Sequence, residues 1–465
     1  MKQKKYGLYL IAATLLLGSC KKQLDLQPTD SFSDANAFLT ISDVQLGLNE
    51  AYGRYSTYVN DMYTNALTSD EAKLGVDNAG QGALTFRFQY ASDGTTGGDV
   101  TAAWGGYYAL IDQVNRVLPF VPTVLAGPGE EPRRDIMKGQ LLALRGIAHF
   151  GLLQAYSKRY DPNDPRGVPI MLVSDPLGQP ARNKSGDVMA QIEKDLSDAK
   201  ALLPAVTVAN FSDTVMNKVN IAAYQARIAL YKGDYAAAIT YSTEVISSAV
   251  KPLVTGTAYT GIWTDANANE TLFRIRFATG TGVGALWTTT GGQIYISPSD
   301  KLVASYDVAD IRKAAFIGTS GGNNYVNKFF ASSRGGRVVD LKASRISEMY
   351  LIRAEANAKK ATPDLAAGAA DLNALRAQRI TGYTNQTFPT AAALVTAVLD
   401  ERFKELCFEG FRFYDLKRNN LPVQRSATDA SPAWQTLPAS SNLFVYPIPR
   451  TEMNANRNMT QNDGY

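Results

Sequence analysis

NIAAYQARIALYKGDYAAAITYSTEVI, residues 220–246, is the stretch that decides the fold class. It predicts two helices, at 218–231 and 235–248, on either side of a Lys-Gly-Asp turn. Its alanines let the two helices approach closely, and Gly233-Asp234 turns the chain between them. A scaffold built from helix pairs is therefore expected.

The same segment resembles a tetratricopeptide repeat, and the chain holds three further helix pairs of a loosely similar kind. A helical block closes the series near the C-terminus. The other helices are predicted at 42–59, 100–121, 133–158, 185–203, 345–359, 364–379 and 391–417. Because the spacing between pairs is irregular, the pattern indicates a repeat-like scaffold rather than a regular array. The predicted fold class is all-α dominated, with four tetratricopeptide-like pairs and irregular insertions.

Two long insertions interrupt the helices, at 68–99 and 251–338. Both are rich in glycine and polar residues, and the second contains the strand-like runs TLFRIRF (271–277) and GQIYIS (292–297). Long loops on a rigid scaffold are where binding residues tend to lie. We therefore expect the ligand-binding insertions here, followed by a distinct C-terminal region at 390–465.

The N-terminus has the pattern of a secretory leader. Three lysines within the first five residues precede an apolar run at 8–17, which is too short to span a bilayer comfortably. Leu17-Gly18-Ser19-Cys20 then matches the lipobox of bacterial lipoprotein leaders. This predicts a signal peptide at 1–19, acylation of Cys20 and a tether at 20–40. The alternative is an uncleaved anchor helix, which would not need the four lipobox residue types in order.

Composition excludes several classes of protein. The 465 residues hold 47 Lys+Arg against 43 Asp+Glu, and cleavage before Cys20 removes three lysines, which leaves the mature chain near neutrality. Such a chain has no basic footprint for nucleic acid. With one histidine, His149, and one cysteine besides Cys20, there is little material for a zinc site or a His-dependent triad. No cofactor and no metal are expected, and Cys407 has no intramolecular disulfide partner.

Several long motifs resemble the SusD/RagB family of outer-membrane lipoproteins. They are spread over nearly the whole mature chain, and the two at the C-terminal end are the most specific. The motifs are LDLQPTDSF (24–32), WGGYYALIDQVN (104–115), LLALRGIAHFGLLQAYSKRY (141–160) with GVPIML (167–172), RAEANAKK (353–360) with LNALRAQR (372–379), ERFKELCFEGFRFYDLKR (401–418) and YPIPRTEMNANRNMTQNDGY (446–465). The chain departs from the family pattern at Phe413, at Asn456-Arg457 and at Asp463, which are packing and turn positions.

The resemblance implies a glycan-binding lipoprotein that acts as a lid over a SusC-like TonB-dependent transporter. The protein would then be anchored by lipid to the outer membrane, facing outward, and would not be an enzyme. Two other readings remain open: a helical-repeat protein that binds a peptide or protein, and a glycoside hydrolase.

Several carboxylates are candidate catalytic groups. Glu401, Glu405 and Glu409 recur at four-residue spacing, where two carboxylates could flank a sugar. Because Arg402, Lys404 and Arg412 interleave with them, an ion-pair lattice is the stronger interpretation. Asp70-Glu71 could meet sugar hydroxyls or a cation, although an acidic pair in a loop is usually solvated. His149 is expected to be packed and hydrogen-bonded, and Cys407 to be an inert, buried thiol.

Aromatic residues are the better candidates for ligand binding, because sugar rings present apolar faces that stack on flat side chains. Two stretches mix aromatics with Asn, Asp and Gly: 84–106, and 263–270 through 286–300. The candidate ligand-binding residues are Trp287, Tyr295, Phe88, Tyr90, Trp104 and Asp70. Trp287 is predicted to be exposed in its Gly/Thr-rich loop, whereas Trp104 and Tyr107 suit a packed helix at least as well.

Overall fold

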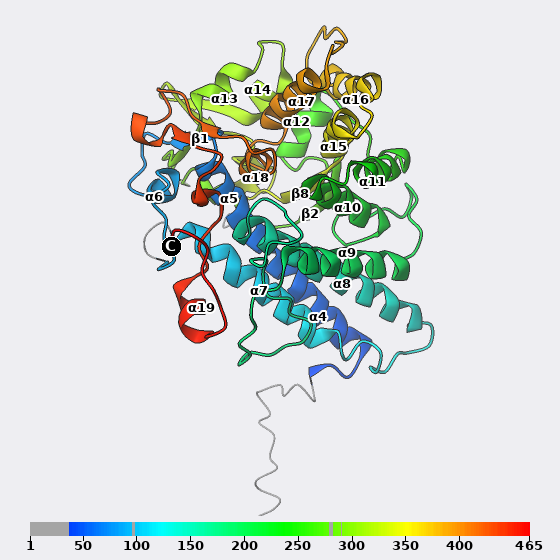
Figure 1. Ribbon diagram of the computed structural model, residues 1–465. Helices are drawn as coiled ribbons and strands as arrows, with labels where there is room; N and C mark the ends of the chain where they lie inside the picture. The colour runs from blue at the N-terminus through cyan, green and yellow to red at the C-terminus, as the bar shows by residue number, and fades with distance from the viewer. Residues whose placement is uncertain (1–36, 95–97, 279–281, 290) are drawn as a thin grey trace, which may run out of the picture.

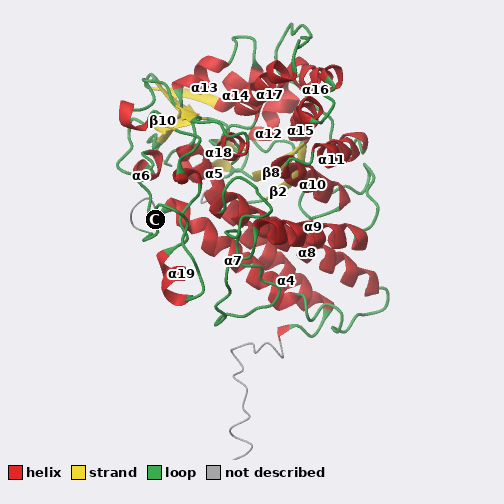
Figure 2. Ribbon diagram, in the orientation of Figure 1, coloured by secondary structure: helices red, strands yellow, loops and turns green. Residues whose placement is uncertain are grey.

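A computed structural model describes residues 37–94, 98–278, 282–289 and 291–465. Helices dominate it (Figures 1 and 2), as the sequence predicted. The α-helices are α4 (Ile41–Arg54), α5 (Tyr58–Thr68), α6 (Ala83–Phe86), α7 (Asp99–Val117), α8 (Glu131–Tyr156), α9 (Ser185–Leu202), α10 (Lys218–Lys232), α11 (Tyr235–Ser247), α12 (Gly256–Trp263), α13 (Asp300–Ser305), α14 (Ile311–Phe316), α15 (Ile346–Lys359), α16 (Leu365–Ala377), α17 (Ala391–Glu405), α18 (Arg412–Arg418) and α19 (Arg450–Ala455).

The strands are short and pair only in antiparallel twos. They are β1 (Ala72–Leu74) with β3 (Ile296–Pro298), β2 (Thr271–Ile275) with β8 (Leu341–Arg345), β4 (Ile317–Ser320) with β5 (Asn323–Val326), β6 (Ala331–Ser332) with β7 (Gly335–Gly336), and β9 (Val423–Gln424) with β10 (Thr436–Leu437). Four short 3₁₀ turns lie at Tyr55–Thr57, Val283–Leu286, Pro432–Trp434 and Asn442–Phe444. In the part of the chain that the structure describes, the strands thus form separate two-stranded sheets and no central sheet.

The predicted helix pairs pack against each other as pairs. Helix α4 contacts α7, α8 contacts α9, α10 contacts α11 and α15 contacts α16. Figure 1 shows α4, α7, α8 and α9 together in one half of the molecule, with α10, α11, α15 and α16 stacked along one side. Small residues allow the close approach: a Cβ at Gly151 of α8 would lie 2.4 Å from the Tyr107 ring of α7.

Local sequence explains where the central pair begins and ends. The side chain of Asn217 accepts hydrogen bonds from the backbone N–H groups of Val219 and Asn220 and so caps α10. Gly233 ends α10 in the left-handed conformation, at φ 84°. Asp234 then caps α11 by accepting from Ala237 N. The two-residue turn therefore consists of one stop signal and one start signal.

Two predicted helices are interrupted, which corrects their boundaries. The helix expected at 42–59 begins one residue earlier, capped by Thr40, and is divided by a 3₁₀ turn into α4 and α5, the second of which runs on to Thr68. The block at 391–417 divides into α17 and α18, because Phe408 at φ 62° and Gly410 at φ 85° turn the chain between them. Glu409 therefore lies in this turn and not on the helix.

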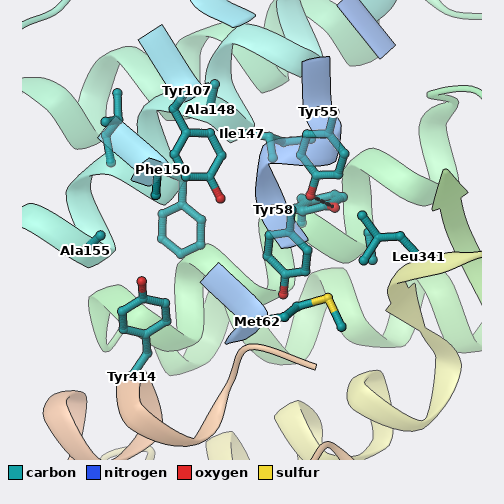
Figure 3. Packing of buried hydrophobic residues seen from close by; sticks show 14 of the residues in the cluster. Tyr55, Tyr58, Met62, Tyr107, Ile147, Ala148, Phe150, Ala155, Leu341 and Tyr414 are labelled. Atoms are coloured by element: carbon teal, nitrogen blue, oxygen red, sulfur yellow. Dashed lines mark hydrogen bonds between the residues drawn. The ribbon is translucent and has the colours of Figure 1, made fainter. Parts of the chain in front are cut away.

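A large hydrophobic core joins the helices to the C-terminal segments. Figure 3 shows Tyr55, Tyr58, Tyr107 and Tyr414 in it, drawn from three different parts of the chain. Tyr107 and Tyr414 both donate their hydroxyls to Asp61, which is buried. Burial raises the pKa of Asp61 to about 7.

His149 is packed and hydrogen-bonded in α8, as expected. Its Nδ1 lies 3.0 Å from the carbonyl of Arg145, and its Nε2 accepts from Met171 N. Burial lowers its pKa to about 4, so the ring is neutral at physiological pH. Cys407 is buried too, and burial raises the pKa of its thiol to about 12. Among the described helices, we find none with the length and apolarity that a bilayer span requires.

Candidate functional site

The two predicted insertions meet through β1 and β3. Ala72 pairs with Pro298, and Leu74 pairs with Ile296. Beyond the strands, Gly75 N donates to Tyr295 O at 2.8 Å. Loops that lie more than 200 positions apart in the chain thus form one local structure, beside the label β1 in Figure 1.

Side chains lock this junction in place. Asn78 donates through Nδ2 to the carbonyls of Gln81 (2.8 Å) and Tyr295 (2.9 Å). The Asp77 carboxylate accepts from Ile294 N at 2.8 Å. At Gly75 a Cβ would lie 2.2 Å from the Ile294 carbonyl oxygen, so only glycine allows the two loops to come this close.

Five residues of this junction keep surface that is open to solvent, and we call them the β1–β3 surface. Val76 and Gln293 are exposed, and Asn78, Gln81 and Tyr295 are half-buried. Amide side chains can both donate to and accept from hydroxyl groups, and a tyrosine ring offers an apolar face. This combination suits a ligand with many hydroxyls and flat apolar faces. The sequence pointed to Tyr295 but not to the amides, since nothing local marks which polar residues of two distant loops will meet at one junction.

Trp287 does not lie on this surface, and the prediction that it is exposed is wrong. Its side chain is fully buried, with its ring centroid 5.3 Å from that of Phe408 and 6.1 Å from that of Tyr63. Its carbonyl accepts from Tyr295 N and Ile296 N at 3.0 and 3.1 Å. Phe408 covers the ring from a distant part of the chain, which the composition of the loop could not reveal. The backbone of Trp287 thus holds the backbone of Tyr295 in place.

Phe88 and Tyr90 lie elsewhere, against the C-terminal region. The Tyr90 ring is buried between Tyr446 and Tyr465, and its hydroxyl donates to Leu443 O. Phe88 is half-buried, with the Arg425 guanidinium 4.3 Å from its ring centroid. Neither residue contributes to the β1–β3 surface.

Trp104 borders a separate groove of about 350 Å³. Its ring lies 4.9 Å from that of Tyr108, and the groove continues along Pro169, Met171 and Glu452. Only 4% of Trp104 is exposed, and Tyr107 is wholly in the core, so most of both rings serves packing. Ligand binding by Trp104 stays a prediction, and any contact would come from this groove.

Asp70 and Glu71 are buried, which corrects the view of a solvated loop pair. Arg412 Nε and Lys301 Nζ lie 2.7 and 2.6 Å from the Asp70 carboxylate. Burial opposes its ionisation, but these two cations outweigh burial and hold the pKa of Asp70 below its usual value. Asp70 therefore anchors the base of the insertion and offers nothing to a ligand.

Glu71 shows the opposite balance. Its Oε1 accepts from Phe408 N at 3.1 Å, and its Oε2 is buried without a hydrogen-bond partner among the described residues. Burial raises the pKa of Glu71 to about 8. This side chain is consequently protonated at neutral pH.

The glutamates at 401, 405 and 409 form an ion-pair lattice, as interpreted, but with other partners than those expected. Glu405 meets Arg312, Arg345 and Arg379, all fully buried. Glu401 pairs with Arg312 and Arg376, and Glu409 with Arg345 and Lys328. Of the neighbouring cations, Arg402 pairs with Asp415 and Arg412 with Asp70, while Lys404 only approaches Glu401 at 3.9 Å. The cations that pair with these glutamates therefore come from four other segments of the chain, and not from the neighbouring positions in the sequence.

Within the ranges that the structure describes, no group of three or more His, Cys, Asp or Glu side chains is arranged to hold a metal ion. Cys20 and its lipobox lie outside the described residues, so the lipid anchor stays a prediction.

Two family models match the chain. Residues 318–465 match the model described as SusD family, and residues 22–230 match the model described as starch-binding, associating with outer membrane. The curated relatives include SusD-like protein P38 of Formosa agariphila, 26% identical over 52% of this chain and 45% of that protein. SusD-like protein P2 of the same organism is 23% identical over 99% of this chain and 100% of that protein. The alignment thus spans under half the length of P38 and the whole of P2.

Solved structures share the fold. A SusD superfamily protein from Bacteroides thetaiotaomicron superposes with a TM-score of 0.81, at 23% identity, over 91% of this chain and all of that one. A laminarin-binding SusD-like protein superposes with a TM-score of 0.69, at 20% identity, over 92% of this chain and all of that one. Taken together, the two family models, the SusD-like relatives and the shared fold support a SusD/RagB family protein, so the resemblance of the motifs is confirmed.

Proposed function

We propose that this protein is a surface lipoprotein that binds an oligosaccharide at the β1–β3 surface and passes it to a partner TonB-dependent outer-membrane transporter, without cleaving it. One observation carries the placement of the site: both predicted insertions contribute to one surface that presents amides beside a tyrosine ring. The family model described as starch-binding and the laminarin-binding neighbour support a carbohydrate as the ligand.

The chemistry of the surface indicates how a glycan would be held. Tyr295 would stack on a sugar face, and Gln81 and Gln293 would exchange hydrogen bonds with hydroxyls, while Asn78 holds the backbone beneath them through its own hydrogen bonds. The buried contact between Trp287 and the Tyr295 backbone keeps the tyrosine in position, so binding would need little reordering of this loop. Val76, which is 64% exposed, adds an apolar contact at the edge.

A glycan array tests the ligand class, using the soluble form that lacks residues 1–20. We expect binding to oligosaccharides, and laminari- and malto-oligosaccharides are the first to be titrated afterwards by calorimetry. The oligosaccharide should be recovered intact by chromatography after prolonged incubation. Binding of peptides alone would favour the helical-repeat reading, and release of shorter sugars would favour a hydrolase.

Tyr295→Ala tests the site. We expect affinity to fall about ten- to a hundredfold, which is typical of an aromatic anchor worth about 1–3 kcal/mol. Tyr241→Ala is the matched control, because Tyr241 is a half-buried tyrosine of α11, at a distance in the fold. Equal affinities for the two variants would remove the β1–β3 surface from the proposal.

Cys20→Ala tests the anchor. The wild-type protein should incorporate labelled palmitate and fractionate with the outer membrane, and the variant should do neither. Label in the variant would overturn the assignment of Cys20. Co-purification of the anchored protein with a β-barrel transporter tests the partner.

A further inference from the structure

A second cavity, of about 300 Å³, lies where the C-terminal segments meet the end of α8. It shares no residue with the β1–β3 surface. Its lining comes from the segment after α8, the end of α18, the segment 439–445 and the C-terminal end of the chain. The lining residues are Lys158, Arg159, Lys417, Asn420, Ala439, Ser440, Ser441, Asn442, Phe444, Val445 and Asp463. Basic and hydroxyl or amide side chains thus dominate the wall.

Lys417 is the buried charged residue of this wall, with 5% of its surface exposed. Its ammonium donates to the carbonyls of Gln154, at 2.7 Å, and Ser157. It makes no ion pair with a carboxylate among the described residues. Since an ammonium has three N–H donors, one remains available.

The carbonyls at the end of α8 give this ammonium only partial negative charge. Burial outweighs this compensation and lowers the pKa of Lys417 to about 7. A buried cation that lacks a counter-ion is costly, and an anion beside it would remove that cost.

The remaining charges of the cavity do not supply this anion. Asp463 is the one carboxylate in the lining, and both of its oxygens are already in ion pairs, with Lys158 at 3.0 Å and with Arg166. Arg159 is exposed and has no ion pair with any described residue. The lining therefore holds three basic side chains against a single, already neutralised carboxylate.

Hydroxyl donors complete the wall. Ser441 Oγ accepts from Leu443 N at 3.2 Å, so its own hydrogen is free to donate. Ser440 lies beside it and is exposed. Hydroxyls next to a lysine and an arginine fit the acceptor oxygens of a carboxylate or sulfate.

We propose that this cavity binds a small oxyanion, a carboxylate or a sulfate group, between Lys417 and Arg159. The site is independent of the glycan surface, and it would accept either the free ion or an acidic sugar that carries the same group.

Calorimetry on the soluble form lacking residues 1–20 tests the proposal with sodium sulfate and sodium galacturonate. Sodium chloride at matched ionic strength and neutral galactose are the controls. We expect saturable binding of sulfate or galacturonate and none of galactose. Tighter binding of galacturonate than of sulfate would identify an acidic sugar, and the reverse a free ion. Heats no larger than those of chloride would overturn the proposal.

Arg159→Ala is the decisive variant, because this exposed side chain can be removed without disturbing the fold. We expect the affinity for the bound anion to fall about tenfold, in line with the loss of one charge-assisted hydrogen bond. Arg276→Ala is the matched control, since Arg276 is also exposed and lies outside the cavity lining. Unchanged affinity in Arg159→Ala would overturn the assignment.

The pH dependence tests Lys417 without mutation. The other charged groups that line the cavity are Lys158, Arg159 and Asp463. Hydrogen bonds from Arg166 and Lys158 lower the pKa of Asp463 to about 2, so it stays ionised. The ammonium form of Lys417 binds the anion, and affinity should fall as the pH rises from 6 to 8.5. A flat profile over this range would show that Lys417 is not a ligand.

Discussion

The ion-pair lattice around Glu405 and the β1–β3 surface are built by the same kind of long-range meeting of segments, but they differ in what they bury. Glu405, Arg312, Arg345 and Arg379 have no exposed surface. On the β1–β3 surface, Val76 is 64% exposed and Tyr295 is only half-buried. The lattice can therefore serve only the fold, whereas the surface has side chains left over for a ligand.

Phe408 and Trp287 connect the two regions. Phe408 follows the last turn of α17 and packs on the ring of Trp287. The carbonyl of Trp287 in turn accepts a hydrogen bond from Tyr295 N. Substitutions in the ion-pair lattice or at Trp287 should lower the stability of the fold. Substitutions of the exposed residues of the β1–β3 surface should lower only the affinity for ligand. The following predictions test that division, from the largest expected effect to the smallest.

Glu405→Gln should give the largest loss of stability. It leaves three buried arginines short of one negative charge, and breaking a buried pair typically costs about 3–5 kcal/mol. Denaturant unfolding of the soluble form measures this. Glu193→Gln, in an exposed pair with Lys232, is the control and should change stability by less than about 1 kcal/mol. Similar values for both variants would show that the lattice is not structural.

Trp287→Ala should destabilise the fold by about 3–5 kcal/mol, because it opens a cavity between Tyr63 and Phe408. A melting curve measures the loss. Leu177→Ala serves as the control, because Leu177 is 90% exposed. A variant at Trp287 that melts like the wild type would mean that this ring does not support the junction.

Glu71 should make stability fall as the pH rises. Its folded-state pKa is raised from 4.5 to about 8, so the folded state holds the proton more tightly. The resulting contribution is complete below about pH 4.5 and is lost as the pH approaches 8. Between pH 5 and 8.5, the free energy of unfolding of Glu71→Gln should consequently rise by a few kcal/mol relative to that of the wild type, at about 1.4 kcal/mol per pKa unit.

Urea unfolding at both pH values measures this difference. The control is Glu50→Gln, in an exposed pair with Arg54, which should leave the slope unchanged. Part of the slope should persist in Glu71→Gln, since burial also raises the pKa of Asp61. A wild-type slope in Glu71→Gln would contradict the buried, protonated state of this group.

Val76→Ser should give the smallest effect on stability, within about 0.5 kcal/mol, because an exposed side chain loses little on replacement. Titration with the oligosaccharide found on the array should nevertheless show weaker binding. A marked loss of stability would show that Val76 supports the fold rather than the binding surface.

The helix pairs could be predicted because their signals are local. Asn217, Gly233 and Asp234 act within one or two turns of the chain, and the alanines between them determine how closely α10 and α11 approach. The same holds for His149, whose apolar neighbours on one helix correctly indicated burial. The break at Phe408 escaped prediction because a non-glycine residue at φ 62° needs tertiary contacts to hold it.

The candidate site divides in the same way. The sequence predicted binding loops at 68–99 and 251–338 and a ligand contact at Tyr295, and these stay predictions. It wrongly predicted that Trp287 is exposed and that Asp70 is solvated. Both errors have one cause, since the groups that bury these side chains, Phe408 and Arg412, come from more than 100 positions away. The composition of a loop does not show which distant residues will pack over its side chains.

By itself, then, the sequence determined the helical scaffold and the family, because caps, turns, small residues and long motifs are written in contiguous residues. Only the tertiary structure decided which aromatic ring faces solvent, which arginines neutralise the glutamates and which loops share a surface. Burial and ion pairing depend on distances across the fold, and the pairing of β1 with β3 joins residues that lie more than 200 positions apart in the chain.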